Sequence, residues 1–206
     1  MKEHIKLAVV LPVGPDHEAA DTIDSVFVYA TPDVRMFAID DSRNPATRRF
    51  LETVDPRITV LHPAGEGNRG GLWTSLARAY AYIFERYTFD TLLRIDTDAL
   101  IIGRNPEEDA HRYFNAHPET GMLGSYRRDC NDEPRDFGVV SSRLRAESGV
   151  RGLRNIRRRR VLRQWMKRAR RFNYEPGEHT LGGAVFVSAA CVSAMYEGGF
   201  LRVAIA

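Results

Sequence analysis

Two carboxylates stand inside an otherwise apolar stretch of the sequence, from Leu92 to Ile102. Asp96 and Asp98 are two residues apart, so in an extended backbone their side chains point to the same side. A buried carboxylate is costly unless it is paired or holds a cation, so this pair predicts a divalent-metal site at the end of a strand. A surface turn bent by Asp-Thr-Asp is the alternative interpretation. The apolar residues on both sides favour the metal site.

Two further polar clusters follow apolar segments earlier in the chain. The apolar run Ile5–Val13 ends at a turn around Pro12 to Asp16, and the run Val34–Ile39 ends at Asp40 to Ser42. In a parallel sheet, ligands bind outside the carboxyl ends of the strands. We therefore expect the three polar clusters to converge at one edge of a sheet.

The elements that must position these clusters alternate between strands and helices. The predicted strands are 5–13, 34–39, 57–62 and 91–95, and the predicted helices are 19–29, 45–54 and 72–87. This alternation is typical of a parallel sheet that is covered by helices. The predicted fold class is therefore α/β, with a mainly parallel sheet, in a single domain over residues 1–206.

The composition is that of an ordinary globular chain, because 43% hydrophobic and 28% charged residues in 206 are enough for one sizeable core. No apolar run approaches the length of a membrane span, and Met1 to His4 do not begin a signal peptide. Cys130 and Cys191 lie far apart without metal-like spacing, which fits a reducing compartment. The sequence therefore predicts a cytoplasmic protein.

In their order and spacing, these motifs resemble those of GT-A type glycosyltransferases, closest in pattern to family 2. The matching features are a proline near the end of the first strand, a DDxS box, an Asn-Arg-Gly-Gly loop, a DxD motif, a Gly-Gly pair before a strand, and a later Gly-Gly-Phe. They fall at Pro12, Asp40–Ser42, Asn68–Gly71, Asp96–Asp98, Leu181–Ser188 and Gly198–Phe200. The resemblance implies a Rossmann-like GT-A sheet and covers residues 4–126 and 178–201.

The resemblance also implies a nucleotide-sugar donor, with a UDP-sugar expected. Asp40 or Asp41 would accept hydrogen bonds from the nucleotide base, and a helix N-cap is the alternative role. Asp96 would lie near the ribose and the metal. Asp98 would bind Mn²⁺ or Mg²⁺, hard cations that suit carboxylate and phosphate oxygens.

The remaining donor-site residues implied by the resemblance are Pro12, Arg69, Gly182 and Gly183. The guanidinium of Arg69 would pair with the diphosphate, whereas a solvated loop arginine is the alternative. The two glycines would let the backbone approach the donor sugar or the acceptor closely, whereas a plain turn before a strand is the alternative.

A catalytic base is not identified. The resembled family often supplies one in an acidic motif after the Gly-Gly strand, but here only Leu201–Ala206 follow Phe200, without an acid. The other candidate acids are also explained as surface residues, and they are Asp129, Asp132, Glu133, Asp136, Glu178 and Glu197. An upstream base, a retaining reaction and an incomplete domain stay open.

The segment from Ser141 to Phe172 fits the resembled family least, and it is predicted to be a basic helical insertion over 141–172. Residues 151–172 carry eleven Lys and Arg and no acid, so the rest of the chain has a net charge of 3 − 11 = −8. From Val161 onward, apolar residues form one stripe opposite a cationic face. The interpretations are a helix packed on the sheet, a helix on an anionic inner-membrane surface through 151–171, and, least favoured, a nucleic-acid patch.

Two hypotheses of different classes follow. The first is a metal-dependent glycosyltransferase that moves a sugar from a nucleotide diphosphate to a glycan or lipid-linked acceptor. The second is a binding module, either a GT-A-like domain without turnover or a domain whose basic helix docks on a membrane or polyanion. Titration of UDP with and without Mn²⁺ tests the first hypothesis, which fails if no nucleotide binds in the presence of metal.

Overall fold

A computed structural model of the chain describes residues 2–15, 18–62, 71–125, 127–129, 131–180 and 183–203, the side chains of Arg158, Arg202 and Val203 excepted. The chain forms two compact units. The first, here called the α/β unit, comprises Met1–Gly124 and Gly182–Ala206. The second, here called the helical unit, comprises Ser125–Leu181.

The α/β unit is built on a six-stranded sheet with the strand order β3-β2-β1-β4-β6-β5. The strands are β1 (Glu3–Val13), β2 (Val34–Asp40), β3 (Ile58–Leu61), β4 (Tyr87–Ile95), β5 (Met122–Leu123) and β6 (Ala184–Ser188). The first four strands pair in parallel, whereas β6 is antiparallel to both β4 and β5. The predicted α/β fold class with a mainly parallel sheet is therefore confirmed.

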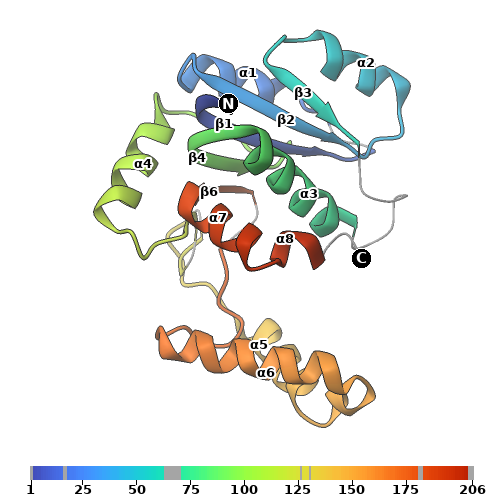
Figure 1. Ribbon diagram of the computed structural model, residues 1–206, viewed down its shortest axis with the longest axis vertical. Coiled ribbons are helices and arrows are strands. Elements are labelled where there is room, and N and C mark those ends of the chain that lie inside the picture. The colour runs from blue at the N-terminus through green and yellow to red at the C-terminus, as the bar shows by residue number, and fades with distance from the viewer. Residues whose placement is uncertain are drawn as a thin grey trace. The chain divides into compact units, whose positions relative to one another are not determined.

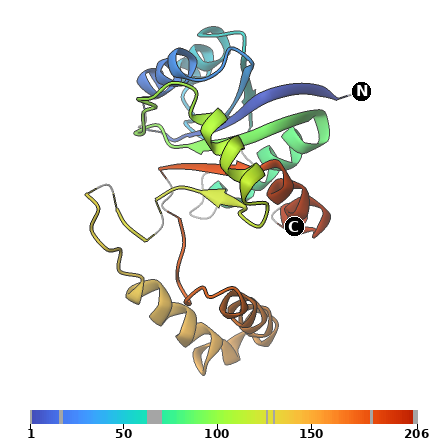
Figure 2. The same cartoon turned by 90° about the vertical axis from the view of Figure 1, so that its left-hand side faces the viewer.

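Helices cover both faces of this sheet (Figure 1). They are α1 (Ala20–Tyr29), α2 (Pro45–Thr53), α3 (Gly71–Arg86), α4 (Pro106–Ala116), α7 (Ala189–Glu197) and α8 (Phe200–Val203). Residues of α3, α7 and α8 share one apolar core with the sheet, and residues of α1 and α2 share the other. Figure 2 shows α4 beside β4 and β6, which it contacts.

The central strands form where the sequence predicts them because they are apolar on both faces. From Leu7 to Leu11, every side chain of β1 is fully buried, as expected of a strand with helices on both sides. Strand β4 begins at Tyr87, four residues before the predicted start, and runs directly on from α3. The predicted stretch Thr91–Ile95 is its buried half.

The helical unit divides the predicted helical segment into separate elements. They are α5 (Gly138–Ser148), the 3₁₀ helix η1 (Arg151–Arg154) and α6 (Ile156–Arg171). A Cβ at Gly152 would lie 1.9 Å from the carbonyl oxygen of Glu147, so the chain reversal between the helices requires a glycine there. None of the described helices is both long and apolar enough to cross a bilayer.

Candidate functional site

The carboxyl end of β1 is the point where the connectivity of the sheet reverses. The chain continues from β1 to β2 and β3 on one side, and β4 lies on the other side. In open α/β sheets, ligands bind in the crevice at such a switch point. Pro12 and Val13 lie at this end of β1, in register with Ile39 and Asp40 of β2. The structure thus brings the first two predicted clusters together.

Asp40 is buried at the end of β2, with 3% of the residue exposed. Its Oδ1 accepts hydrogen bonds from the backbone N–H of Ser42 at 3.1 Å and from the Ser42 hydroxyl at 2.5 Å. Its Oδ2 lies 3.1 Å from Nε of Arg48, on α2. Burial alone would raise the pKa of Asp40, but the hydrogen bonds from Ser42 and Arg48 outweigh it and lower that pKa. Asp40 is therefore an ionised group that holds the turn after β2.

Asp41 follows in a different setting, because its side chain is half-buried and accepts no hydrogen bond from the residues that the structure describes. Its backbone N–H donates to the carbonyl oxygen of Val13 at 2.9 Å, which ties the turn to β1. The N-cap of α2 is Asn44, whose side chain accepts from the N–H of Ala46. The N-cap role considered for Asp40 and Asp41 is therefore wrong.

The turn after β2 also contains a residue in an uncommon backbone conformation. Arg43 has a φ of 56°, in the left-handed region that costs an L-residue roughly 1–2 kcal/mol. Such residues persist where the surrounding contacts hold them, and they gather at functional sites. Here the contacts include the hydroxyl of Ser42, which accepts from the N–H of Asn44 at 3.1 Å.

Asp96 begins the loop after β4 and is held from two sides. Its Oδ1 accepts a hydrogen bond from Arg94 of β4 at 2.5 Å, and 13% of the Arg94 side chain is exposed. Its backbone N–H donates to the carbonyl oxygen of Gly183 at 2.8 Å. A Cβ at Gly183 would meet nothing within 4 Å, so open space lies beside this glycine. The structure therefore places the second predicted glycine next to the DxD motif.

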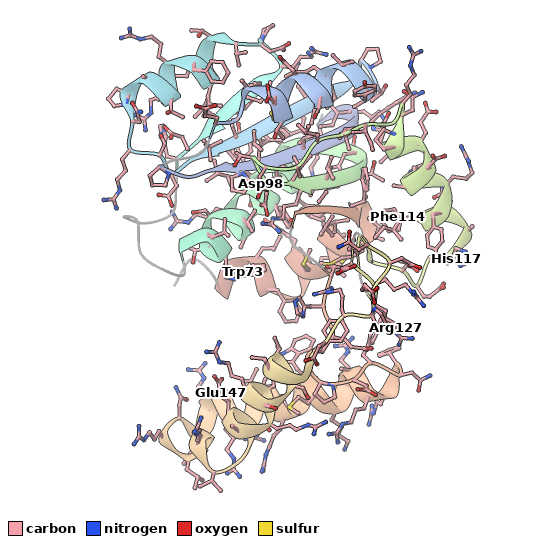
Figure 3. The ribbon with its side chains drawn as sticks, turned by 180° about the vertical axis from the view of Figure 1, so that it is seen from behind. Trp73, Asp98, Phe114, His117, Arg127 and Glu147 are labelled. Atoms are coloured by element: carbon pink, nitrogen blue, oxygen red, sulfur yellow. The ribbon has the colours of Figure 1, made fainter. Side chains whose placement is uncertain are left out.

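Asp98 is exposed in the same loop, and Figure 3 labels it after β4. Its side chain has no hydrogen-bond or ion-pair partner among the described residues. The loop itself is anchored on α1, because the buried hydroxyl of Thr22 lies 2.8 Å from the carbonyl oxygen of Thr97 and 2.9 Å from that of Ala99. Asp98 is thus an exposed carboxylate on a backbone that α1 holds in place.

The two DxD carboxylates differ in how well they fit a cation. No group of three or more His, Cys, Asp or Glu side chains gathers for a metal among the residues that the structure describes. Mg²⁺ is commonly bound by one or two carboxylates together with phosphate oxygens of a substrate, so a third carboxylate is not required. Asp98 is open to such a cation, whereas the charge of Asp96 is already balanced in part by Arg94.

Two predicted site residues, Arg69 and Gly182, lie outside the described part of the chain. Five of the six acids considered as a base accept hydrogen bonds or form ion pairs with neighbouring residues. In the helical unit, Glu178 pairs with Arg127 at 3.4 Å and accepts from the N–H of Glu175. Further acceptors of local hydrogen bonds or ion pairs are Asp129, Asp132, Asp136 and Glu197.

Three residues that the sequence interpretation did not single out support the site. They are Arg48, which pairs with Asp40, Arg94, which pairs with Asp96, and Thr22, which anchors the DxD loop. Arg94 had a visible signal, since it is a cation inside an apolar run two residues before Asp96. Arg48 and Thr22 had none, because their partners are distant in sequence or are backbone carbonyls.

The chain was compared with known proteins. No protein-family model matches it, and no curated protein matches it in sequence. Solved structures that are similar to it include proteins named as glycosyltransferases. One is the bifunctional glycosyltransferase WbbM, with 12% identity and a TM-score of 0.47, where the match covers 98% of this chain and 35% of WbbM.

Two other similar structures contain UDP. Residues 1–349 of TarS from S. aureus, in complex with UDP, share 17% identity with a TM-score of 0.45, over 64% of this chain and 38% of that one. Glucosyl-3-phosphoglycerate synthase from Mycobacterium tuberculosis, in complex with Mn²⁺, UDP and glucosyl-3-phosphoglycerate, also shares 17% sequence identity with this chain, with a TM-score of 0.45. That match covers 98% of this chain and 67% of the synthase. The chain thus spans well under half of the TarS and WbbM chains.

Proposed function

We propose that the α/β unit binds a nucleoside diphosphate sugar, UDP-sugar in the first instance, and transfers the sugar to a glycan or lipid-linked acceptor. The observation that carries this proposal is that the two aspartates of each carboxylate pair differ in their contacts. In each pair one carboxylate is tied into the protein, Asp40 by Arg48 and Asp96 by Arg94. The other, Asp41 or Asp98, has no side-chain partner among the described residues, which leaves its oxygens available to a ligand.

The spacing of the two available carboxylates suits an extended ligand. Asp41 follows β2 and Asp98 follows β4, and these strands flank β1 on opposite sides. Neighbouring strands are about 4.8 Å apart, so the two strand ends are separated by about 10 Å. A nucleoside diphosphate that lies across the end of β1 would present its base near Asp41 and its phosphates near Asp98.

The roles of the individual residues follow from their contacts. The half-buried Asp41 would accept a hydrogen bond from an N–H of the base, while Asp40 holds the turn that positions it. The open space beside Gly183 would admit the donor sugar or the acceptor. Pro12 would shape the floor of the crevice, since it lies at the end of β1 in register with Ile39.

Asp98, with Asp96 beside it, would hold the divalent cation, for which Mn²⁺ and Mg²⁺ are the candidates. When bound, the cation stabilises the negative charge that develops on the diphosphate leaving group. Arg94 limits the repulsion between the two carboxylates, because it neutralises part of the charge of Asp96. Arg69 remains a candidate partner of the diphosphate.

Calorimetric titration with UDP, with and without Mn²⁺, tests the donor site. Wild type should bind UDP more tightly with Mn²⁺, and Asp98→Asn should weaken that binding by at least ~10-fold, equivalent to about 1.4 kcal/mol. Asp24→Asn is the matched control, because Asp24 is an exposed carboxylate on α1. If wild type binds no UDP with metal, or if Asp98→Asn binds as tightly as wild type, the proposal fails.

Turnover separates an enzyme from a binding module. Release of UDP from a UDP-sugar, measured with the acceptor or with water alone, should be seen for wild type and should be lost in Asp98→Asn. Metal-dependent UDP binding without release of UDP from any donor sugar would favour the alternative, a GT-A-like module that binds nucleotide and does not turn it over.

A further inference from the structure

The helical unit carries apolar side chains that remain partly exposed to solvent. Helix α6 packs against α5 and η1, and its least exposed apolar residues are Leu162, Met166 and Ala169. Val161 is nevertheless 46% exposed and Trp165 43%, and Phe172, one residue beyond the helix, is 65% exposed. Part of the apolar stripe of α6 therefore lies outside its contact with α5.

Three of the exposed apolar residues form a strip on the helix, whereas a fourth, Ile156, is 70% exposed and lies on the other side. At about 100° per residue, Val161, Trp165 and Phe172 fall within about 40° of one another, on a different side from Leu162 and Met166. Arginines border the strip, with Arg157 and Arg168 at its edge. The guanidinium carbon of Arg168 lies 5.7 Å from the centre of the Trp165 ring.

A second cationic surface lies on the far side of α6 from this strip. A concavity of about 410 Å³ there is lined by Ile156, Arg159, Arg160, Arg163, Gln164 and Lys167. Two of these cations have an internal role, since Nε of Arg159 and of Arg163 donate to the carbonyl oxygen of Ser148 at 3.1 and 2.8 Å. These bonds supply hydrogen-bond donors to the carbonyl oxygen of the last residue of α5, at the end where a helix leaves its carbonyl oxygens without partners.

We propose that the helical unit docks on an anionic membrane surface through the strip Val161, Trp165 and Phe172, with Arg157 and Arg168 meeting the lipid phosphates. Charge complementarity identifies this partner, because residues 151–172 carry eleven cations and no acid. An aromatic and apolar strip bordered by arginines is the pattern of helices that lie in the membrane interface. A nucleic acid would need the cations but not the exposed strip.

Sedimentation of the full chain with vesicles tests the docking. Vesicles of phosphatidylcholine mixed with phosphatidylglycerol should bind the protein in a salt-sensitive manner, and pure phosphatidylcholine should not. The double variant Arg157→Gln/Arg168→Gln should weaken binding by roughly 30-fold, and Trp165→Ala by roughly 10-fold. Arg157→Lys/Arg168→Lys keeps the charges and should retain most of the binding.

The matched control lies on the same helix. Arg160→Gln/Lys167→Gln removes the same net charge from the far side and should weaken vesicle binding by less than about 5-fold. Equal losses for the two pairs would overturn the assignment of the strip, as would equal binding to neutral vesicles. Binding to duplex DNA that falls with Arg160→Gln/Lys167→Gln, together with no vesicle binding, would identify a nucleic-acid surface instead.

Fluorescence reports insertion directly, because the chain has only two tryptophans. In Trp73→Phe, Trp165 is the single emitter, and anionic vesicles should shift its emission to the blue and allow quenching by brominated lipid. Circular dichroism should show the helical content of wild type for each variant that is compared. Vesicle binding without a shift or quenching would contradict insertion of the strip.

Discussion

The two units of this chain differ in how far they bury their apolar residues. In the α/β unit, both apolar cores consist of sheet and helix residues of that unit, most of them fully buried. In the helical unit, the buried residues among those described are Ser148, Pro176 and Gly177. Since apolar burial is the main driving force of folding, the α/β unit has the means to be stable alone. The helical unit has surface that a partner can cover.

Charge follows the same division. In each of the two carboxylate pairs of the α/β unit, one member is buried or fixed by a cation, as Asp40 is by Ser42 and Arg48. The described cations of α6 are exposed except for Arg159, one of the two arginines that donate to the Ser148 carbonyl. The α/β unit therefore holds part of its charge in fixed positions, whereas the helical unit presents an exposed cationic surface whose attraction to anions depends on salt.

The largest expected effect is on the cores. Phe37 is fully buried and contacts Tyr82 and Tyr87 edge to face, with ring centres 6.0 and 5.3 Å away. Phe37→Ala should lower the free energy of unfolding of the α/β unit by about 3–5 kcal/mol. Met166→Ala, on the half-buried face of α6, should cost the helical unit less than about 1 kcal/mol.

Urea unfolding followed by tryptophan fluorescence can measure each unit separately. Trp73 lies on α3 and Trp165 on α6, so Trp165→Phe leaves a reporter in the α/β unit and Trp73→Phe leaves one in the helical unit. Equal destabilisation by Phe37→Ala and Met166→Ala would show that the helical unit has a core of its own, and the contrast between the units would be lost.

The next effect concerns the fixed carboxylates. Asp40→Asn should destabilise the α/β unit by about 2 kcal/mol at pH 7, because it weakens charge-assisted hydrogen bonds from Ser42 and Arg48. The pKa of Asp40 is lowered by folding, so its contribution is present above its ordinary value of 3.8 and is lost as the pH falls through the folded value. Thermal unfolding of both proteins from pH 7 to pH 3 measures this difference.

Asp41→Asn is the control that separates a role in UDP binding from a role in stability. Its side chain accepts no hydrogen bond in the described part of the chain, so the stability change should stay within about 0.5 kcal/mol while UDP binding weakens. Arg160→Gln in the helical unit should be equally neutral for stability. A large loss of stability in Asp41→Asn with unchanged UDP binding would reverse the roles of the two aspartates.

The sequence predicts the sheet and its edge well because the signals there are local. A run such as Ile5–Val13 is apolar throughout, and the polar residues that end each strand mark the crevice. The family resemblance predicts a strand within Leu181–Ser188, where β6 lies, but not its antiparallel pairing, since the pairing of Arg94 with Val185 depends on residues far apart in the chain. The helix α4 was not predicted. The break between α5 and α6 depends on the space at Gly152, which hydrophobic periodicity does not report.

The site was predicted as a set of carboxylates, and the structure adds which of them are already engaged. That distinction rests on Arg48 and Arg94, whose side chains reach their partners only in the folded state. The alternatives left open for Arg69 and Gly182 remain predictions. For the helical unit, the sequence shows the cations and the apolar stripe, but only packing against α5 shows which part of the stripe stays exposed.

The last expected effect concerns Glu107 of α4, a carboxylate that is buried in the α/β unit. Its Oε1 accepts from the N–H of Thr31 at 2.9 Å, whereas Oε2 is buried without a partner among the described groups. Burial, with a smaller contribution from Glu108, raises the pKa of Glu107 against the opposing effects of the Thr31 hydrogen bond and Lys6. Folding therefore favours its protonated form.

The sign of the pH effect is opposite to that of Asp40. The contribution of Glu107 is fully present below its ordinary pKa of 4.5 and is lost as the pH rises through the folded value. Glu107→Gln keeps the acceptor for Thr31 and cannot ionise, so wild type should lose stability relative to this variant between pH 4 and pH 7. Glu108→Gln, at an exposed position, should show no such dependence. If the stabilities of wild type and Glu107→Gln change with pH in the same way, the Glu107 carboxylate is solvated. The α/β unit would then carry this charge at its surface, as the helical unit carries its cations.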